Sequence, residues 1–154
     1  MTTIYDVEKK FKDLPYMPLE RAKKLQSLFN KYDIKHCLEL GFYHGKSSAF
    51  IAAILDEREK GHLATIDLLS AKDKNPNINQ ILDQLNLSKR VTVFYEPKSY
   101  TWRLMKMIEK NPQPIFDFCY IDGGHTWDQT GFAFTETTSP HYLSTKSHIH
   151  CTKF

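Results

Sequence analysis

The chain has 154 residues, of which 21 are Lys or Arg and 18 are Asp or Glu, so its formal net charge is +3. This length is typical of one domain. Hydrophobic residues at 41% and charged residues at 25% are typical of a globular protein and exclude the disordered and fibrous classes. The small positive charge is spread along the chain and gives no reason to expect a nucleic-acid partner.

Cysteine content and hydropathy indicate in which cellular compartment the protein is expected. The three cysteines, Cys37, Cys119 and Cys151, are an odd number, and none belongs to a Cys-x-x-Cys pair. This argues against a disulfide framework or a zinc ribbon and favours a cytoplasmic protein. The first ten residues lack the apolar stretch of a signal peptide. The longest apolar run, residues 49–55, is much shorter than the ~20 residues of a membrane-spanning helix, so no membrane partner is expected.

Helical and strand-like hydrophobic patterns alternate along the first 121 residues. A helix is expected from Pro18, because proline fits the first helical turn. The elements expected after it are, in chain order, a strand at 34–40, a helix at 47–55, a strand at 62–66, a helix at 79–87, a strand at 90–95, a helix at 100–110 and a strand at 115–121. This alternation predicts an α/β fold with a parallel sheet and right-handed crossovers. We predict the strand order 3-2-1-4.

The composition changes after Phe134. Residues 135–154 are rich in Ser, Thr and His and have almost no apolar periodicity. We therefore expect a domain over residues 1–134 and an irregular segment over 135–154 that has the character of a non-native tail. The fourth strand would then be an exposed edge of the sheet, open to strand pairing and to formation of a homodimer.

Acidic residues and glycines stand at three of the predicted strand ends. Glu39-Leu40-Gly41 ends the first strand, Asp67 follows the second, and Asp122 follows the fourth. In open parallel sheets, ligands bind beyond the carboxyl ends of the strands. The functional site is expected at this edge of the sheet.

The turn after the first strand allows two interpretations. Gly45-Lys46-Ser47 matches the end of a phosphate-binding P-loop, but only three residues separate Gly41 from Gly45, whereas a P-loop has four. The alternative is a nucleoside site, in which an acid about 20 residues past the glycine turn accepts hydrogen bonds from the ribose. Asp67 follows Gly45 by 22 residues, which favours the nucleoside site and leaves Lys46 as a solvated residue at a helix start.

Two segments resemble a known family. Glu39-Leu-Gly-Phe-Tyr-His-Gly-Lys-Ser47 resembles the first motif of class I S-adenosylmethionine-dependent methyltransferases. Phe116-Asp-Phe-Cys-Tyr-Ile-Asp-Gly-Gly-His-Thr-Trp-Asp128 resembles the fourth-strand segment of methyltransferase family 24. The resemblance covers roughly residues 34–134. It implies a Rossmann-like three-layer sandwich, apparently truncated after the fourth strand, so that the C-terminal strands of the methyltransferase fold are missing.

The resemblance also implies a role for individual residues. It places S-adenosylmethionine against a set of residues at the strand ends, namely Glu39, Gly41, Tyr43, Gly45, Asp67, Leu68 and Ser99. Within this set, Asp67 would take the ribose hydroxyls, with Leu68 beside the adenine and Ser99 at its edge. Asp122 and His125 would lie at the catalytic centre, although His125 is equally well explained as a structural residue.

The chemistry expected from this resemblance is methyl transfer to a small-molecule or sugar hydroxyl. An acceptor hydroxyl needs a general base, for which His125 is the candidate, or a divalent cation such as Mg²⁺, for which Asp122 is the candidate ligand. Two alternatives stay open: a P-loop nucleotide-binding protein, and a fragment that binds the cofactor without catalysis.

Overall fold

A single parallel sheet forms the centre of the protein. The structure, a computed structural model, describes residues 1–111, 116–123 and 143–151, the last range by its backbone alone. The strands lie in the order β3-β2-β1-β4-β5 and are all parallel. Their bounds are β1 His36–Leu40, β2 His62–Leu68, β3 Val91–Glu96, β4 Phe116–Ile121 and β5 Leu143–Cys151. The predicted order of the first four strands, 3-2-1-4, is confirmed.

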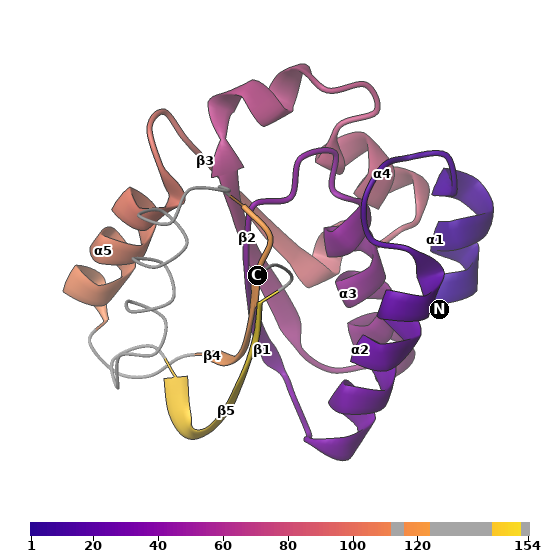
Figure 1. Cartoon of the computed structure of the whole chain (residues 1–154), viewed down its shortest axis with the longest axis horizontal. Coiled ribbons are helices and arrows are strands. Elements are labelled where there is room, and N and C mark those ends of the chain that lie inside the picture. The colour runs from indigo at the N-terminus through magenta and orange to yellow at the C-terminus, as the bar shows by residue number, and fades with distance from the viewer. Residues whose placement is uncertain (112–115, 124–142, 152–154) are drawn as a thin grey trace.

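Helices cover both faces of this sheet, as Figure 1 shows. The helices α1 to α4 lie on one face and α5 on the other, with bounds α1 Ile4–Phe11, α2 Leu19–Lys31, α3 Lys46–Glu57, α4 Ile78–Gln84 and α5 Tyr100–Lys110. Short 3₁₀ helices, η1 Leu69–Asp73 and η2 Ser88–Arg90, complete the described elements. Helix α1 was not predicted, although Thr3 and Asp6 form a capping box at its start. Among the described residues, no helix combines the length and the hydrophobicity needed to cross a bilayer.

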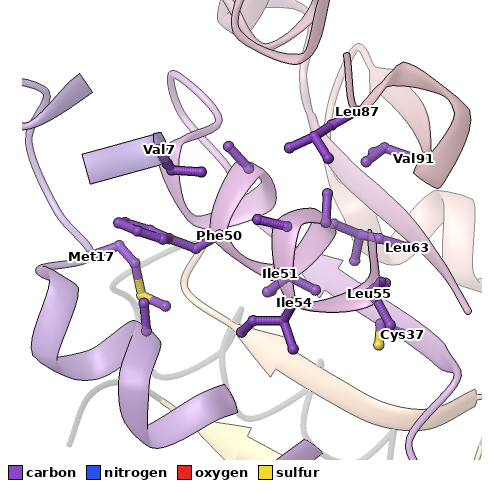
Figure 2. Close-up of a cluster of buried hydrophobic side chains, with 14 of the residues drawn as sticks. Val7, Met17, Cys37, Phe50, Ile51, Ile54, Leu55, Leu63, Leu87 and Val91 are labelled. Atoms are coloured by element: carbon purple, nitrogen blue, oxygen red, sulfur yellow. The ribbon is translucent and has the colours of Figure 1, made fainter. Parts of the chain in front are cut away.

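Helix α3 is the centre of the larger hydrophobic core. Its residues from Lys46 to Asp56 are all buried. Figure 2 shows Phe50, Ile51, Ile54 and Leu55 among side chains from α1, the sheet and the segment before β3. A helix that is apolar on all sides is stable only when it is covered on all sides. Helix α3 meets this condition by lying between the sheet and the other helices of its face.

The strand β5 corrects the expectation for the end of the chain. Residues 135–154 were predicted to be irregular, but residues 143–151 form a strand that pairs with β4 in parallel register. The prediction failed because the segment has no apolar periodicity, whereas the unpaired amides and carbonyls of β4 provide a template for any extended backbone. The β4 edge through which a homodimer was expected is therefore covered by β5, and Phe116, Phe118 and Tyr120 are buried.

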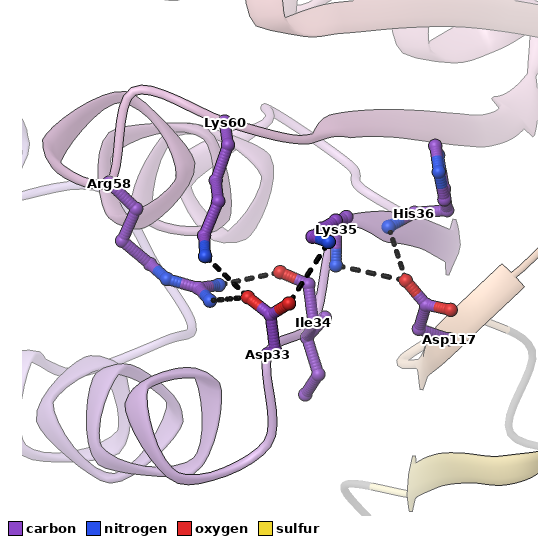
Figure 3. Close-up of polar contacts among 7 residues, drawn as sticks. All are labelled: Asp33, Ile34, Lys35, His36, Arg58, Lys60 and Asp117. Carbon is purple, nitrogen blue, oxygen red and sulfur yellow. Dashed lines mark hydrogen bonds and ion pairs between the residues drawn. The ribbon is translucent and has the colours of Figure 1, made fainter.

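Two aspartates fix the amino-terminal end of the sheet, opposite the expected site. Figure 3 shows Asp117 of β4, whose Oδ2 accepts hydrogen bonds from the backbone N–H groups of Lys35 and His36 at 3.0 and 2.9 Å. Nearby, Asp33 forms ion pairs with Lys60, Lys35 and Arg58. These hydrogen-bonded lysines lower the pKa of Asp33 to about 2. The residues expected to form the functional site lie at the other, carboxyl-terminal end of the sheet.

Candidate functional site

The glycine turn between β1 and α3 packs directly on the backbone that follows β4. Gly41 has a φ of +87°, and a Cβ atom there would lie 2.2 Å from the Cα of Gly123. The N–H of Gly41 donates to the carbonyl of Ile66 at 2.8 Å, and the N–H of Asp122 donates to the carbonyl of Leu40 at 2.9 Å. The ends of β1, β2 and β4 are thus tied together, which only a glycine at position 41 permits.

Asp67 organises this turn from the neighbouring strand. Its Oδ2 accepts hydrogen bonds from the N–H groups of Phe42 and Tyr43 at 2.8 and 2.7 Å, and its Oδ1 accepts one from Leu68 at 2.7 Å. A carboxylate offers about four acceptor positions, so further donors can still bind Oδ1. The carboxylate therefore shapes the turn, and it keeps the capacity for the predicted ribose contact.

Glu39 lies beneath the turn and does not line the cavity described below. Because side chains alternate along a strand, Glu39 points toward α3 while Leu38 and Leu40 face the α5 side. It is fully buried, and its Oε2 accepts hydrogen bonds from Ser48 and Thr65. Its Oε1 has no hydrogen-bond partner among the described residues. Burial raises the pKa of Glu39 to about 7, against the opposing effect of nearby hydroxyls.

A cavity of about 180 Å³ opens at this end of the sheet. Its walls come from the N-terminal segment, the glycine turn and the ends of β2 and β4: Pro15, Tyr16, Gly41, Phe42, Tyr43, His44, Lys46, Ser47, Asp67, Asp122 and Gly123. Four of the predicted site residues, Gly41, Tyr43, Asp67 and Asp122, are therefore brought together. The prediction of a pocket at the carboxyl ends of the strands is confirmed.

The other predicted site residues have different positions. Gly45, at φ +100°, is the N-cap of α3 and packs against Ile78. Leu68 is 40% exposed beside Asp67. The side chain of Ser99 accepts a hydrogen bond from the N–H of Thr101 at 3.1 Å and caps α5. His125 lies outside the described residues.

Several cavity residues were not predicted from the sequence. Pro15 and Tyr16 come from the connection between α1 and α2, which carries no motif and lies far from the glycine turn in the sequence. Ser47 belongs to the turn itself, and so does His44, for which the sequence left open a place in the wall of the pocket or a position covering it. The ring Nδ1 of His44 lies 2.7 Å from the carbonyl oxygen of Pro76, so His44 ties the turn to the loop before α4. The position of Ser47 next to the Gly45-Lys46 step of the turn was the signal in the sequence that could have placed it in the cavity wall.

Lys46 corrects another expectation. It was predicted to be solvated, but it is only 4% exposed. Its Nζ donates to the backbone carbonyls of Lys12 and Leu14, both at 3.3 Å, and lies 3.5 Å from a carboxylate oxygen of Glu8. A P-loop lysine must instead reach the phosphates held by the glycine turn. The contacts of Lys46 thus argue against the P-loop interpretation.

The described residues do not by themselves form a metal centre. No group of three or more His, Cys, Asp or Glu side chains is close enough to share an ion in the part of the chain that the structure describes. Asp122 lines the cavity, but Asp67, the other acid there, is hydrogen-bonded to the turn.

Comparison with known proteins identifies the domain type. A family model described as a methyltransferase domain matches residues 38–151, which include the glycine turn, Asp67, Asp122 and β5. No curated protein sequence matches the chain.

Solved structures share the fold at low sequence identity. A candidate caffeoyl-CoA O-methyltransferase from Staphylococcus aureus superposes with a TM-score of 0.70 at 19% identity, over 99% of this chain and 66% of its own. SAH-bound PaMTH1, a methyltransferase from Podospora anserina, superposes with a TM-score of 0.69 at 16% sequence identity, over 97% of this chain and 59% of its own. An O-methyltransferase from Bacillus cereus in complex with SAH superposes with a TM-score of 0.63 at 21% sequence identity, over 86% of this chain and 60% of its own. The chain thus spans less than two thirds of the length of these proteins.

Proposed function

Because the chain belongs to the methyltransferase domain family, we propose that it binds S-adenosylmethionine at the carboxyl ends of β1, β2 and β4 and transfers the methyl group to a small-molecule hydroxyl. The observation that supports this most is the convergence of the glycine turn, Asp67 and Asp122 on one cavity. The cavity of about 180 Å³ is smaller than typical small-molecule sites of about 300–1,000 Å³. We therefore place the amino-acid end of the cofactor inside it and the adenine along the exposed surface beside Leu68.

The chain's own residues would bind and orient the cofactor. The N–H groups of Gly41, Phe42 and Tyr43 already donate to Ile66 and Asp67, so the backbone N–H groups that suit a carboxylate are those at the N-terminus of α3. The Oδ1 of Asp67 would accept a ribose hydroxyl, as the sequence predicts. The bound cofactor supplies an electrophilic methyl group on a sulfonium. Since the reaction is a displacement, the largest contribution of the protein is alignment of the acceptor oxygen with that methyl group.

The acceptor side of the proposal rests on Asp122 and His125. Asp122 lines the cavity at the end of β4, where an acceptor hydroxyl would meet the methyl group. The hydroxyl loses its proton as it attacks, and a carboxylate or an imidazole within hydrogen-bond distance can take that proton. Asp122 could also hold a divalent cation together with residues outside the described ranges. The class of acceptor, a phenolic or sugar hydroxyl, is a proposal from the family resemblance.

Titration calorimetry with S-adenosylmethionine, S-adenosylhomocysteine and Mg-ATP tests the binding step. We expect micromolar binding of the first two ligands and none of Mg-ATP. Asp67→Ala should weaken binding by about 5- to 150-fold, the equivalent of ~1–3 kcal/mol for a charged hydrogen bond. Asp73→Ala, an exposed acid of the neighbouring η1, is the matched control and should bind like the wild type. Binding of Mg-ATP in preference to the adenosyl ligands would overturn the proposal.

Mass spectrometry of reactions with panels of phenols and sugars, with and without Mg²⁺, tests the transfer step. Methylated product identifies the acceptor class and the metal requirement. Binding of S-adenosylmethionine without product from any acceptor would support the alternative of a cofactor-binding fragment without catalysis.

A further inference from the structure

The N-terminal part of the chain covers the cavity. Residues 12–17, here called the strap, connect α1 to α2, and two of them, Pro15 and Tyr16, line the cavity. The ring of Tyr16 meets the ring of Tyr43 edge-on, with 5.5 Å between centroids. Tyr43 belongs to the glycine turn, so the strap and the turn form opposing walls of the same opening.

The conformation of the strap depends on contacts outside it. Tyr16 and Met17 have φ values of +64° and +38°. Such left-handed conformations are unfavourable for residues with a side chain and persist only where surrounding contacts hold them. Met17 is one anchor, because it is fully buried and its sulfur accepts a hydrogen bond from the hydroxyl of Tyr120 at 3.3 Å. This anchor fixes the end of the strap nearer α2.

Lys46 is the anchor at the other end. Its ammonium has three donor positions, and it faces two strap carbonyls, those of Lys12 and Leu14, and the carboxylate of Glu8 in α1. The Lys46 side chain is 5% exposed, so its charge has little access to water. An ammonium removed from water is tolerated only when these partners stay in place. The charge of Lys46 and the position of the strap are therefore coupled.

We propose that Lys46 is a positioning residue for the nucleoside ligand: through the strap, it holds Tyr16 as one wall of the cofactor cavity. The inference rests on the proposed function and adds to it a closing element that the glycine turn and Asp67 do not provide. The ligand class is an adenosyl sulfonium or thioether. Without Lys46 the strap keeps the buried Met17 and the hydrogen bond from the N–H of Leu14 to the carbonyl of Phe11, but it loses the donor that holds two of its carbonyls. Only a fraction of the molecules is then closed, and the apparent affinity falls by that fraction.

A double-mutant cycle on S-adenosylhomocysteine affinity tests this proposal. Lys46→Met and Tyr16→Ala are each expected to raise the dissociation constant about tenfold. If Lys46 acts through Tyr16, the double variant should also be about tenfold weaker, because two changes in one coupled unit are not additive. Lys24→Met, an exposed lysine of α2, is the control and should leave affinity unchanged. Additive losses, about a hundredfold in the double variant, would mean that Lys46 contacts the ligand directly and would overturn the proposal.

Two further measurements separate positioning from general stability. Hydrogen exchange over residues 11–18 should accelerate in Lys46→Met and stay near the wild-type rate in the control. Lys46→Arg keeps a charged donor but replaces the compact ammonium by a larger planar group, and it should restore part of the affinity lost in Lys46→Met. If Lys46→Met does not fold, Glu8→Gln can replace it, because it removes only one partner of Lys46. This variant should show a smaller loss of affinity and a smaller acceleration of hydrogen exchange over residues 11–18. If affinity falls with no change in exchange, the proposal is wrong. If the wild type binds no adenosyl ligand, the proposed function fails, whereas the exchange experiment still tests the anchoring by Lys46.

Discussion

Replacing Glu39 by glutamine tests the electrostatics beneath the glycine turn. Burial raises the pKa of the folded Glu39 carboxyl from 4.5 to about 7. The folded state therefore binds this proton more tightly than the unfolded state. The stabilisation is fully present below pH 4.5 and is lost as the pH rises through about 7. At ~1.4 kcal/mol per pKa unit, this loss amounts to about 3 kcal/mol of the free energy of unfolding.

Urea unfolding of both proteins at several pH values between 4.5 and 8 measures this contribution. The glutamine side chain of the variant does not titrate, so the free energy of unfolding of the wild type, taken relative to Glu39→Gln, should fall by about 3 kcal/mol across this range. Glu109→Gln, at an exposed position of α5, is the matched control for replacing a glutamate by glutamine. A pH-independent difference for Glu39→Gln would refute the reasoning, because the buried carboxyl would then titrate as it does in the unfolded chain.

Three other substitutions test separate parts of the structure. Gly41→Ala should lower the free energy of unfolding by about 3 kcal/mol or more in urea unfolding, because its Cβ would meet the Cα of Gly123 at 2.2 Å; an unchanged value would contradict this close approach. Asp122→Asn should leave calorimetric affinity for S-adenosylhomocysteine nearly unchanged and strongly reduce methyl transfer, whereas normal turnover would assign Asp122 a structural role. Asp33→Asn should lose its stability difference from the wild type as the pH falls from about 4 to 2, because hydrogen bonding to Lys60 lowers the pKa of Asp33 to about 2. A difference that persists at pH 2 would show that the ion pairs are not its cause.

Sequence reasoning predicted the parts of the site that lie on single elements. The apolar runs before Gly41, Asp67 and Asp122 indicated buried strands, and parallel strands bring their carboxyl ends to one edge. The confirmed order of the first four strands is the one expected for a Rossmann-like, doubly wound sheet. These inferences succeeded because they depend on local periodicity and on topology that few chains violate.

Contacts between distant segments were beyond the reach of local patterns. Lys46 was expected in water because lysine at a helix start is usually exposed, yet three partners from α1 and the strap bury it. The strand β5 was missed because its residues show no strand periodicity and its pairing depends on the open edge of β4.

The α/β fold, the glycine turn and the acids at the strand ends could be inferred from the sequence alone, because hydrophobic period and residue type act within a few positions of one another. The residues that form the cavity walls around that turn depend on the packing of the whole domain. Tyr16 reaches the cavity, and Asp67 shapes the turn, through hydrogen bonds and packing between residues at least 24 positions apart. Such contacts form only when the whole core brings the segments together, and no local pattern encodes them.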